Sequence, residues 1–223
     1  GYAVYGVRLA GHGTSPSDLA QTPWEAWYES YNRGYAIIKS LTDNIILGGF
    51  STGGCLALIA AARKGFKAQA VFSICAPLQV RNYSIRLAPS IVTLNTVLKR
   101  IGRNREEWEY VENTPENPHI NYFRNPLTGV RELMNCMGEM ERLLPEVKIP
   151  AYILQGSRDT VVNPVSAQLI FNQLGSTYKE MTMMERARHG IVNGAGREEV
   201  FDRVHHWLQQ APAHHRHHQQ SHA

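Results

Sequence analysis

The stretch Asn44-Ile45-Ile46-Leu47-Gly48-Gly49-Phe50-Ser51-Thr52-Gly53-Gly54-Cys55-Leu56-Ala57-Leu58 decides how this chain is expected to fold. It opens with a short apolar run typical of a buried strand and closes with small and apolar residues typical of a helix. Between them lies the pattern G-x-S-x-G, in the strand–turn–helix context that a nucleophile elbow requires. The flanking glycines would let strand and helix approach, and the turn would present the hydroxyl of Ser51. In an ordinary loop the same serine would only cap the helix.

The residue after the serine has an expected role of its own. Thr52 stands at the start of the helix, where backbone N–H groups point outward and the helix dipole favours negative charge. The sequence therefore predicts that the N–H of Thr52 faces the oxyanion that forms when Ser51 attacks a carbonyl.

An acid and a histidine come later in the chain order that this type of site uses, which is serine, acid, histidine. Asp159 comes just after the apolar run 149–155, at the expected carboxyl end of a strand. His189 comes after the expected strand 178–184 and precedes the last expected helix. Asp159 would hold the tautomer of His189, which would act as base and then acid. Taken singly, Asp159 is also a common turn residue, and His189 a common surface residue.

Together these blocks resemble the α/β-hydrolase superfamily, in particular bacterial carboxylesterases and monoacylglycerol lipases. The resemblance rests on Arg8-Leu9-Ala10-Gly11-His12-Gly13-Thr14-Ser15, on the elbow around Ser51, and on Gly156-x-x-Asp159 with His189. It extends from Gly1 to about Gln210. It implies a mostly parallel sheet with helices on both faces, and a serine hydrolase whose triad is Ser51, Asp159 and His189.

The resemblance also implies something about the start of the chain. The family opens with three further strands, and a loop after the third donates a second oxyanion N–H. Residues 1–7 of this chain match the fourth strand of the family. We therefore expect that the first strands are missing and that the chain as given has reduced activity.

Composition fits one globular domain. The chain has 223 residues, 43% of them hydrophobic, and a formal net charge of +4. That mild charge does not indicate a nucleic-acid partner, and no apolar run is long enough to span a bilayer. The chain has three cysteines without a C-x-x-C pattern, which favours reduced thiols and a cytoplasmic location.

The order of patterns predicts alternating strands and helices, and thus a parallel sheet. We expect strands at 2–8, 44–49, 68–75, 149–155 and 178–184, and helices at 23–41, 53–64, 164–174 and 196–209. A domain at 1–210 would carry a helical cap insertion at about 78–146, including the apolar stretch 85–101 and a helix at 127–144. The cap would form an apolar roof for acyl chains, or else be ordinary helix packing.

Histidines outside the expected triad have simpler interpretations. His12 lies between two glycines and is expected to be a structural hydrogen-bonding residue. The tail 211–223 contains five histidines and is expected to be disordered, with adventitious metal binding as the alternative.

The sequence thus predicts an enzyme that cleaves carboxylic esters of short-to-medium acyl chains through an acyl-enzyme. It would act on a small-molecule ester or lipid, need no cofactor or metal, and not insert stably into a membrane. The alternatives are an acyltransferase or another hydrolase on the same triad, or a non-catalytic binding module that keeps the scaffold.

Overall fold

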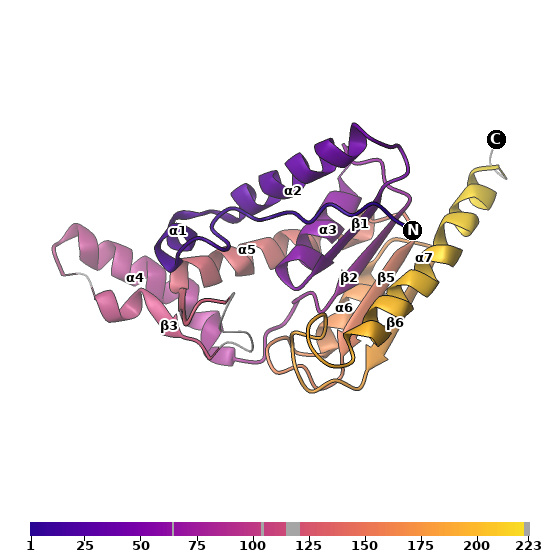
Figure 1. Ribbon diagram of the computed structural model, residues 1–223. Helices are drawn as coiled ribbons and strands as arrows, with labels where there is room; N and C mark the ends of the chain where they lie inside the picture. Colours follow the sequence, from indigo (N-terminus) through magenta and orange to yellow (C-terminus); the bar gives the residue numbers. More distant parts are fainter. Residues whose placement is uncertain (64, 104, 115–120, 221–223) are drawn as a thin grey trace. The chain divides into compact units, whose positions relative to one another are not determined.

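A computed structural model describes residues 1–63, 65–103, 105–114 and 121–220, with the backbone alone for residues 83, 84 and 212–220. The chain divides into two compact units (Figure 1). Unit 1 comprises residues 1–34 and 82–136, and unit 2 comprises residues 35–81 and 137–223. The insertion predicted at 78–146 thus falls largely in unit 1, together with the first 34 residues.

Unit 2 is built on a parallel sheet. Its strands are β1 (Ile46–Phe50), β2 (Ala70–Ile74), β5 (Ala151–Gly156) and β6 (Lys179–Met184), in the spatial order β1-β2-β5-β6. Each neighbouring pair is parallel, so all four carboxyl ends lie at one edge of the sheet. The prediction of a mostly parallel sheet is confirmed, and each strand begins one to two residues after its predicted start.

Helices cover both faces of this sheet. On one face lie α3 (Thr52–Ala62) and α6 (Val165–Gln173). On the other lies α7 (Arg197–Gln220). The helix after the elbow is buried, since Leu56, Leu58 and Ile59 have at most 1% exposure. A helix that is apolar on every side can only be stable when it is surrounded by other elements.

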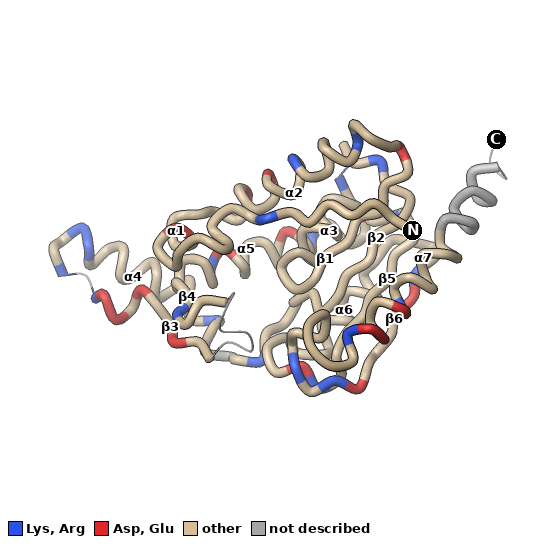
Figure 2. The backbone as a smooth tube through the Cα atoms, viewed as in Figure 1, with Lys and Arg blue, Asp and Glu red and all other residues tan. Residues whose placement is uncertain are grey.

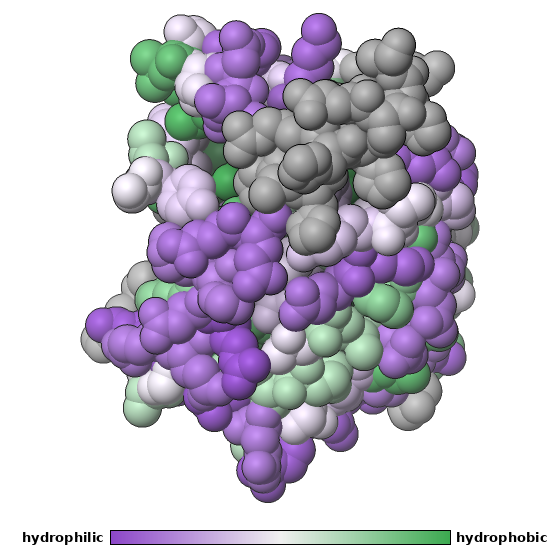
Figure 3. Space-filling model, turned by 90° about the vertical axis from the view of Figure 1, so that its right-hand side faces the viewer, coloured by the Kyte–Doolittle hydropathy of each residue, from purple (hydrophilic) through white to green (hydrophobic). Residues whose placement is uncertain are grey.

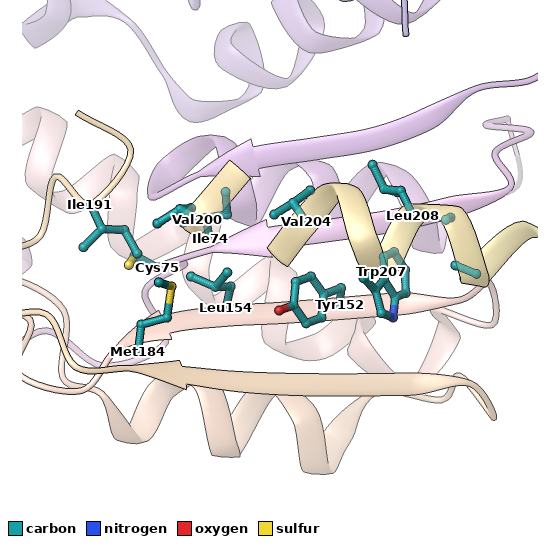
Figure 4. Packing of buried hydrophobic residues seen from close by; sticks show 12 residues of the cluster. Ile74, Cys75, Tyr152, Leu154, Met184, Ile191, Val200, Val204, Trp207 and Leu208 are labelled. Carbon is teal, nitrogen blue, oxygen red and sulfur yellow. The ribbon is translucent and has the colours of Figure 1, made fainter. Parts of the chain in front are cut away.

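The contact between α7 and the sheet forms a hydrophobic core cluster of unit 2 (Figure 4). Side chains of α7 point onto the β2 and β5 residues that face them, and the rings of Trp207 and Tyr152 stack with centroids 5.2 Å apart. The outward side of α7 carries charged residues, and the face of the molecule that includes it is largely hydrophilic (Figure 3). This one-sided burial is what a surface helix on a sheet requires.

The strand predicted at 2–8 is wrong. No strand is assigned over residues 1–9. A β-strand is defined by hydrogen bonds to a neighbouring strand, and neither sheet of the described residues includes this segment. Several of its apolar side chains are left exposed, Val4 most of all at 88%.

Unit 1 contains helices and a short hairpin. A helix that the sequence did not predict, α1 (Pro16–Gln21), precedes α2 (Trp24–Lys39), which continues into unit 2. The remaining elements are η1 (Tyr83–Leu87), α4 (Ala88–Arg100), η2 (Glu106–Trp108), β3 (Tyr110–Glu112), β4 (Arg124–Pro126) and α5 (Leu127–Leu143), which also continues into unit 2 before η3 (Leu144–Glu146). The antiparallel β3–β4 pair was not predicted either, since segments of three residues show no recognisable period.

The last helix runs further than the sequence predicts. The backbone of α7 is helical to Gln220, beyond the predicted domain end at 210, while residues 221–223 lie outside the described part. Acidic and basic residues are intermixed along both units (Figure 2). Within the described ranges, no helix combines the length and the apolar character that a membrane crossing demands.

Candidate active site

Ser51 stands on a sharp turn between β1 and α3. Its backbone has φ 53° and ψ −123°, a left-handed φ that is rare for a residue with a side chain. The turn is held from the sheet, because the Ser51 N–H donates to the carbonyl of Ile74 over 2.8 Å. The Ser51 side chain makes no capping hydrogen bond to α3. Ser51 therefore does not act as the helix-capping serine of the alternative interpretation.

Glycine is required at one of the two flanking positions of the pattern and not at the other. A Cβ on Gly49 would lie 2.0 Å from the carbonyl oxygen of Gly53, which no side chain can do. A Cβ on Gly53 would meet nothing within 4 Å. Gly54 is tight against β2, with Ser73 Oγ 2.8 Å from its virtual Cβ. The close approach that the sequence pattern suggested for Gly49 and Gly53 alike is thus made by Gly49 and Gly54.

Asp159 lies where β5 has ended and is fully buried. Its Oδ1 accepts hydrogen bonds from the N–H groups of Val161 (2.8 Å) and Val162 (2.9 Å). Its Oδ2 accepts from the side-chain amide of Gln155 at 3.0 Å and from Nδ1 of His189 at 2.8 Å. The carboxylate is therefore fixed by four donors, three of which belong to its own segment of the chain. Asp159 does form the turn that the alternative interpretation described, and it also bonds to the histidine.

His189 joins the acid to the serine. Its Nδ1 faces Asp159 and its Nε2 lies 2.9 Å from Ser51 Oγ. An ionised carboxylate only accepts, so Nδ1 carries the proton and Nε2 is left to accept from the Ser51 hydroxyl. The side chain of His189 is 14% exposed, and its ring packs 4.9 Å from that of Phe50, the last residue of β1. The predicted residues Ser51, Asp159 and His189 are brought into one continuous chain of hydrogen bonds.

The pKa of Asp159 reflects two opposed effects. Burial alone would raise the pKa of this carboxyl group. The hydrogen bond and charge of His189, with the amides of Val161 and Val162, outweigh the burial and lower the pKa below its ordinary value. Asp159 is therefore ionised at neutral pH, as a group that orients a histidine must be.

Two further residues discussed from the sequence, Thr52 and His12, lie in different units of the structure. Thr52 is the first residue of α3, so its N–H has no acceptor within the helix, and it sits beside Ser51 at the positive end of the helix dipole. His12 lies in unit 1, where its Nδ1 bonds to the carbonyl of Ala10 at 3.1 Å and its ring meets that of Trp27 edge-on. His12 thus has the structural hydrogen bond that was expected of it.

Two residues at the site were missed from the sequence. Gln155 is a buried polar side chain inside an otherwise apolar strand, and that pattern was a usable signal, since a buried amide needs a partner. Cys75 comes after β2 with φ 49° and is fully buried. Cys75, Asp159 and His189 each offer one possible ligand atom, and these three atoms lie within 4.8 Å of one another. Within the part of the chain that the structure describes, these residues could therefore hold a metal ion. No local sequence signal links this cysteine to the other two.

Comparisons with known proteins agree with this fold. The sequence is similar to a carboxylesterase of Bacillus subtilis (strain 168), with 23% identity over 212 residues, which are 94% of this chain and 82% of that protein. It is similar to a thermostable monoacylglycerol lipase of Bacillus sp. (strain H-257), with 28% identity over 189 residues, covering 85% of this chain and 72% of that protein.

Among solved structures, the fold resembles one from a study of the metagenome-derived lipolytic enzymes LipS and LipT, with a TM-score of 0.77 and 24% identity over 91% of this chain and 80% of that one. These likenesses confirm the predicted α/β-hydrolase fold. The sequence pattern of the family described as serine aminopeptidase, S33, matches residues 1–195. Since that match covers most of the chain, this protein belongs to the serine aminopeptidase S33 family.

Proposed function

We propose that this protein is a serine hydrolase that cleaves carboxylic esters through an acyl-enzyme, with Ser51 as nucleophile, His189 as base and Asp159 as its orienting acid. The observation that carries the proposal is the hydrogen-bond chain from Ser51 Oγ to His189 Nε2 (2.9 Å) and from His189 Nδ1 to Asp159 Oδ2 (2.8 Å). A nucleophile bonded to a base that a third group orients is the arrangement that activates a serine.

In the first half of the reaction, Ser51 Oγ attacks the ester carbonyl carbon while its proton passes to His189 Nε2. The imidazolium that forms is stabilised by the ionised carboxylate of Asp159, which lies 2.8 Å from Nδ1. The carbonyl oxygen becomes an oxyanion and receives a hydrogen bond from the N–H of Thr52. His189 then gives its proton to the leaving alcohol, and the acyl group stays on Ser51.

In the second half, water takes the place of the alcohol. His189 removes a proton from the water as it attacks the acyl carbon, and returns that proton to Ser51 Oγ when the acid leaves. The steps use groups of this chain and water, so the reaction requires no cofactor.

The substrate class is inferred from the relatives and from unit 1. Those relatives are a carboxylesterase and a monoacylglycerol lipase, so we infer a small ester or a monoacylglycerol as substrate. Within unit 1, α4 leaves apolar side chains on its surface, with Leu94 and Val97 each 50% exposed and Ile101 beyond its end 64% exposed. Exposed apolar groups on a helix suit contact with acyl chains, as proposed for the cap. A preference for short-to-medium chains and a cytoplasmic location are parts of the same proposal.

Peptide hydrolysis is the second candidate, because the family to which the chain belongs is described as serine aminopeptidase. Acyl transfer, in which an alcohol replaces water in the second half, uses the same residues. A binding module without catalysis would have no use for the bond between Ser51 and His189.

A fluorophosphonate probe and a substrate panel test the proposal. The intact chain should be labelled at Ser51, and p-nitrophenyl esters should be turned over much faster than matched p-nitroanilides. Each buried CH₂ of an acyl chain contributes about 0.8 kcal/mol, so kcat/KM should rise from acetyl to medium chains until the pocket is full. Faster anilide than ester turnover would support the peptidase instead, and absence of labelling with no turnover would support the binding module.

A further inference from the structure

Cys75 is a buried nucleophilic group beside the candidate triad that the proposed reaction does not use. Its Sγ, an oxygen of Asp159 and a ring nitrogen of His189 lie within 4.8 Å of one another. The three residues come from three separate places: Cys75 from the end of β2, Asp159 from the end of β5, and His189 from the loop after β6. The parallel sheet brings them together because all these strands end at the same edge.

We propose that Cys75, Asp159 and His189 form a binding site for a thiophilic divalent cation such as Zn²⁺ or Cd²⁺, and that a bound cation blocks ester hydrolysis. The binding rests on the three donor atoms alone, whereas the block rests also on the function proposed for His189.

The spacing of the donors suits such a cation. Zinc takes sulfur at about 2.3 Å and nitrogen or oxygen at about 2.0–2.2 Å, so tetrahedral donor atoms stand roughly 3.3–3.6 Å apart. The donors of Cys75, Asp159 and His189 lie within 4.8 Å of one another, which is close to this arrangement. Ser51 Oγ, 2.9 Å from His189 Nε2, or a water is available for the fourth position.

The charge of the donors suits it too. A thiolate, a carboxylate and a neutral imidazole together carry two negative charges, which a divalent cation neutralises. The buried site then holds no uncompensated charge, the condition under which an ion is tolerated in a protein interior. Binding converts the S–H of Cys75 to a metal–sulfur bond and releases one proton to the solvent. Sulfur and imidazole ligands favour Zn²⁺ and Cd²⁺ over Mg²⁺ and Ca²⁺, which take oxygen.

The surroundings already hold the carboxylate in place. Oδ1 of Asp159 accepts from the amides of Val161 and Val162, which holds the carboxylate in place and leaves Oδ2 as the oxygen that takes the cation. Cys75 itself is part of the buried apolar cluster that includes Met184 and Ile191, so the site borders the hydrophobic core (Figure 4). Outer contacts of this kind orient the ligands of metal sites.

A bound cation removes the base, whichever nitrogen of His189 it takes. Coordination at Nε2 occupies the lone pair that accepts the proton of Ser51. Coordination at Nδ1 moves the ring proton to Nε2, which then donates and no longer accepts. The cation and the reaction therefore exclude each other.

Binding is tested first with Cd²⁺ alone on the intact chain. The sulfur-to-cadmium charge-transfer absorbance in the ultraviolet should saturate at one ion per chain, with one proton released. Cys75→Ala and Cys75→Ser should both weaken this binding by more than the roughly 10–100-fold that loss of an outer contact costs. Cys55→Ala and Cys136→Ala, which remove equally buried thiols, should leave it unchanged. A signal that persists without Cys75, or no signal in the parent chain, would overturn the site.

The histidine-rich tail needs its own control, because histidines bind the same cations. A chain with His214, His215, His217, His218 and His222 replaced by Asn should keep the thiolate signal. Loss of that signal would place the cation on the tail instead and contradict the proposal.

Turnover of a p-nitrophenyl ester supplies the second arm, with each variant compared with its own rate in the presence of a chelator. Zn²⁺ should inhibit the parent chain and slow fluorophosphonate labelling of Ser51, while equal Mg²⁺ should do neither. Cys75→Ser should lose the inhibition. If Cd²⁺ gives the Cys75-dependent signal without slowing turnover, the role of His189 in the proposed function is wrong. If turnover and labelling are normal but no such signal is found, the cation site is wrong and the proposed function stands.

Discussion

Two neighbouring strands end in the same unusual backbone conformation and lead to different environments. Ser51 comes after β1 with φ 53°, and Cys75 comes after β2 with φ 49°; they are the two described residues other than glycine with positive φ. The strands are in register, with Phe50 opposite Ile74, so the two residues lie at corresponding positions of one sheet edge. Each also continues the sheet through its N–H, Ser51 to the carbonyl of Ile74 and Cys75 to that of Leu154.

The segment after each residue makes the difference. Ser51 leads directly into α3 and stays partly exposed, and its hydroxyl is hydrogen-bonded to the imidazole of His189. Cys75 leads into an irregular segment and is fully buried. The same left-handed turn at a strand end therefore leads to two environments: at Ser51 a helix begins and an imidazole is hydrogen-bonded to the side chain, whereas Cys75 is enclosed in the core.

The largest effect should come from removing the hydroxyl at the end of β1. Ser51→Ala should abolish fluorophosphonate labelling and reduce ester turnover to the residual level of a triad without its nucleophile, about 10³–10⁴-fold over water. The circular dichroism of the variant should match that of the parent, since the hydroxyl does not cap α3. Turnover within a few-fold of the parent would assign the nucleophile elsewhere.

The next effect tests whether the partners of Ser51 act as a unit. Asp159→Asn should lower kcat by about 10⁴-fold, because an amide can leave the imidazole in the wrong tautomer. His189→Ala should cost at least as much, and the double variant should be little worse than the worse single variant. Steady-state kinetics of the three variants measure this. Losses that multiply would show that the two residues act independently.

A third effect distinguishes the glycines that shape the end of β1. Gly49→Ala would press a methyl group against the carbonyl of Gly53 and should destabilise unit 2 by more than about 3 kcal/mol, the upper end of overpacking costs. Gly53→Ala is the matched control: its methyl group meets open space in a helix, and it should gain roughly 0.5–1 kcal/mol. Urea unfolding measures both. Equal effects would contradict the close approach at Gly49.

A smaller effect measures the strain at the end of β2. Cys75→Val and Cys136→Val each add the same atoms to a fully buried thiol position, but Cys136 lies within helix α5. The left-handed conformation, which β-branched residues tolerate worst, should make Cys75→Val the more destabilising of the two. The difference between their unfolding free energies is the readout. A larger loss of unfolding free energy in Cys136→Val than in Cys75→Val would contradict backbone strain at Cys75.

The smallest effect concerns acid. The folded-state pKa of Asp159 is lowered, so its ionised form contributes stability that is complete above its unfolded pKa of about 3.9 and is lost as pH falls through the folded value. The unfolding free energies of the parent chain and Asp159→Asn should therefore converge as the pH falls below about 4. Urea unfolding at a series of pH values measures the difference. A difference that stays constant through this range would contradict the lowered pKa.

Much of the fold could be predicted from the sequence, because its signals are local. The glycine-flanked Ser51 between an apolar run and a small-residue helix was enough to place β1 and α3. The spacing of apolar runs predicted the other strands of the sheet, and with them the strand-end positions of Asp159 and His189. The strand predicted at 2–8 failed for the same reason, since an apolar run satisfies the local pattern while strand structure depends on a neighbouring strand.

By itself, then, the sequence determined which residues stand at strand ends, since that depends on periods of two and 3.6 residues and on turn-forming neighbours. Only the tertiary structure decided which side chains meet there. It gave Asp159 its second side-chain donor in Gln155, and it brought Cys75 to the carboxylate and the imidazole. It also leaves space for a side chain at Gly53 and none at Gly49. Such contacts join residues far apart in the chain through the register of a parallel sheet, which no local pattern records.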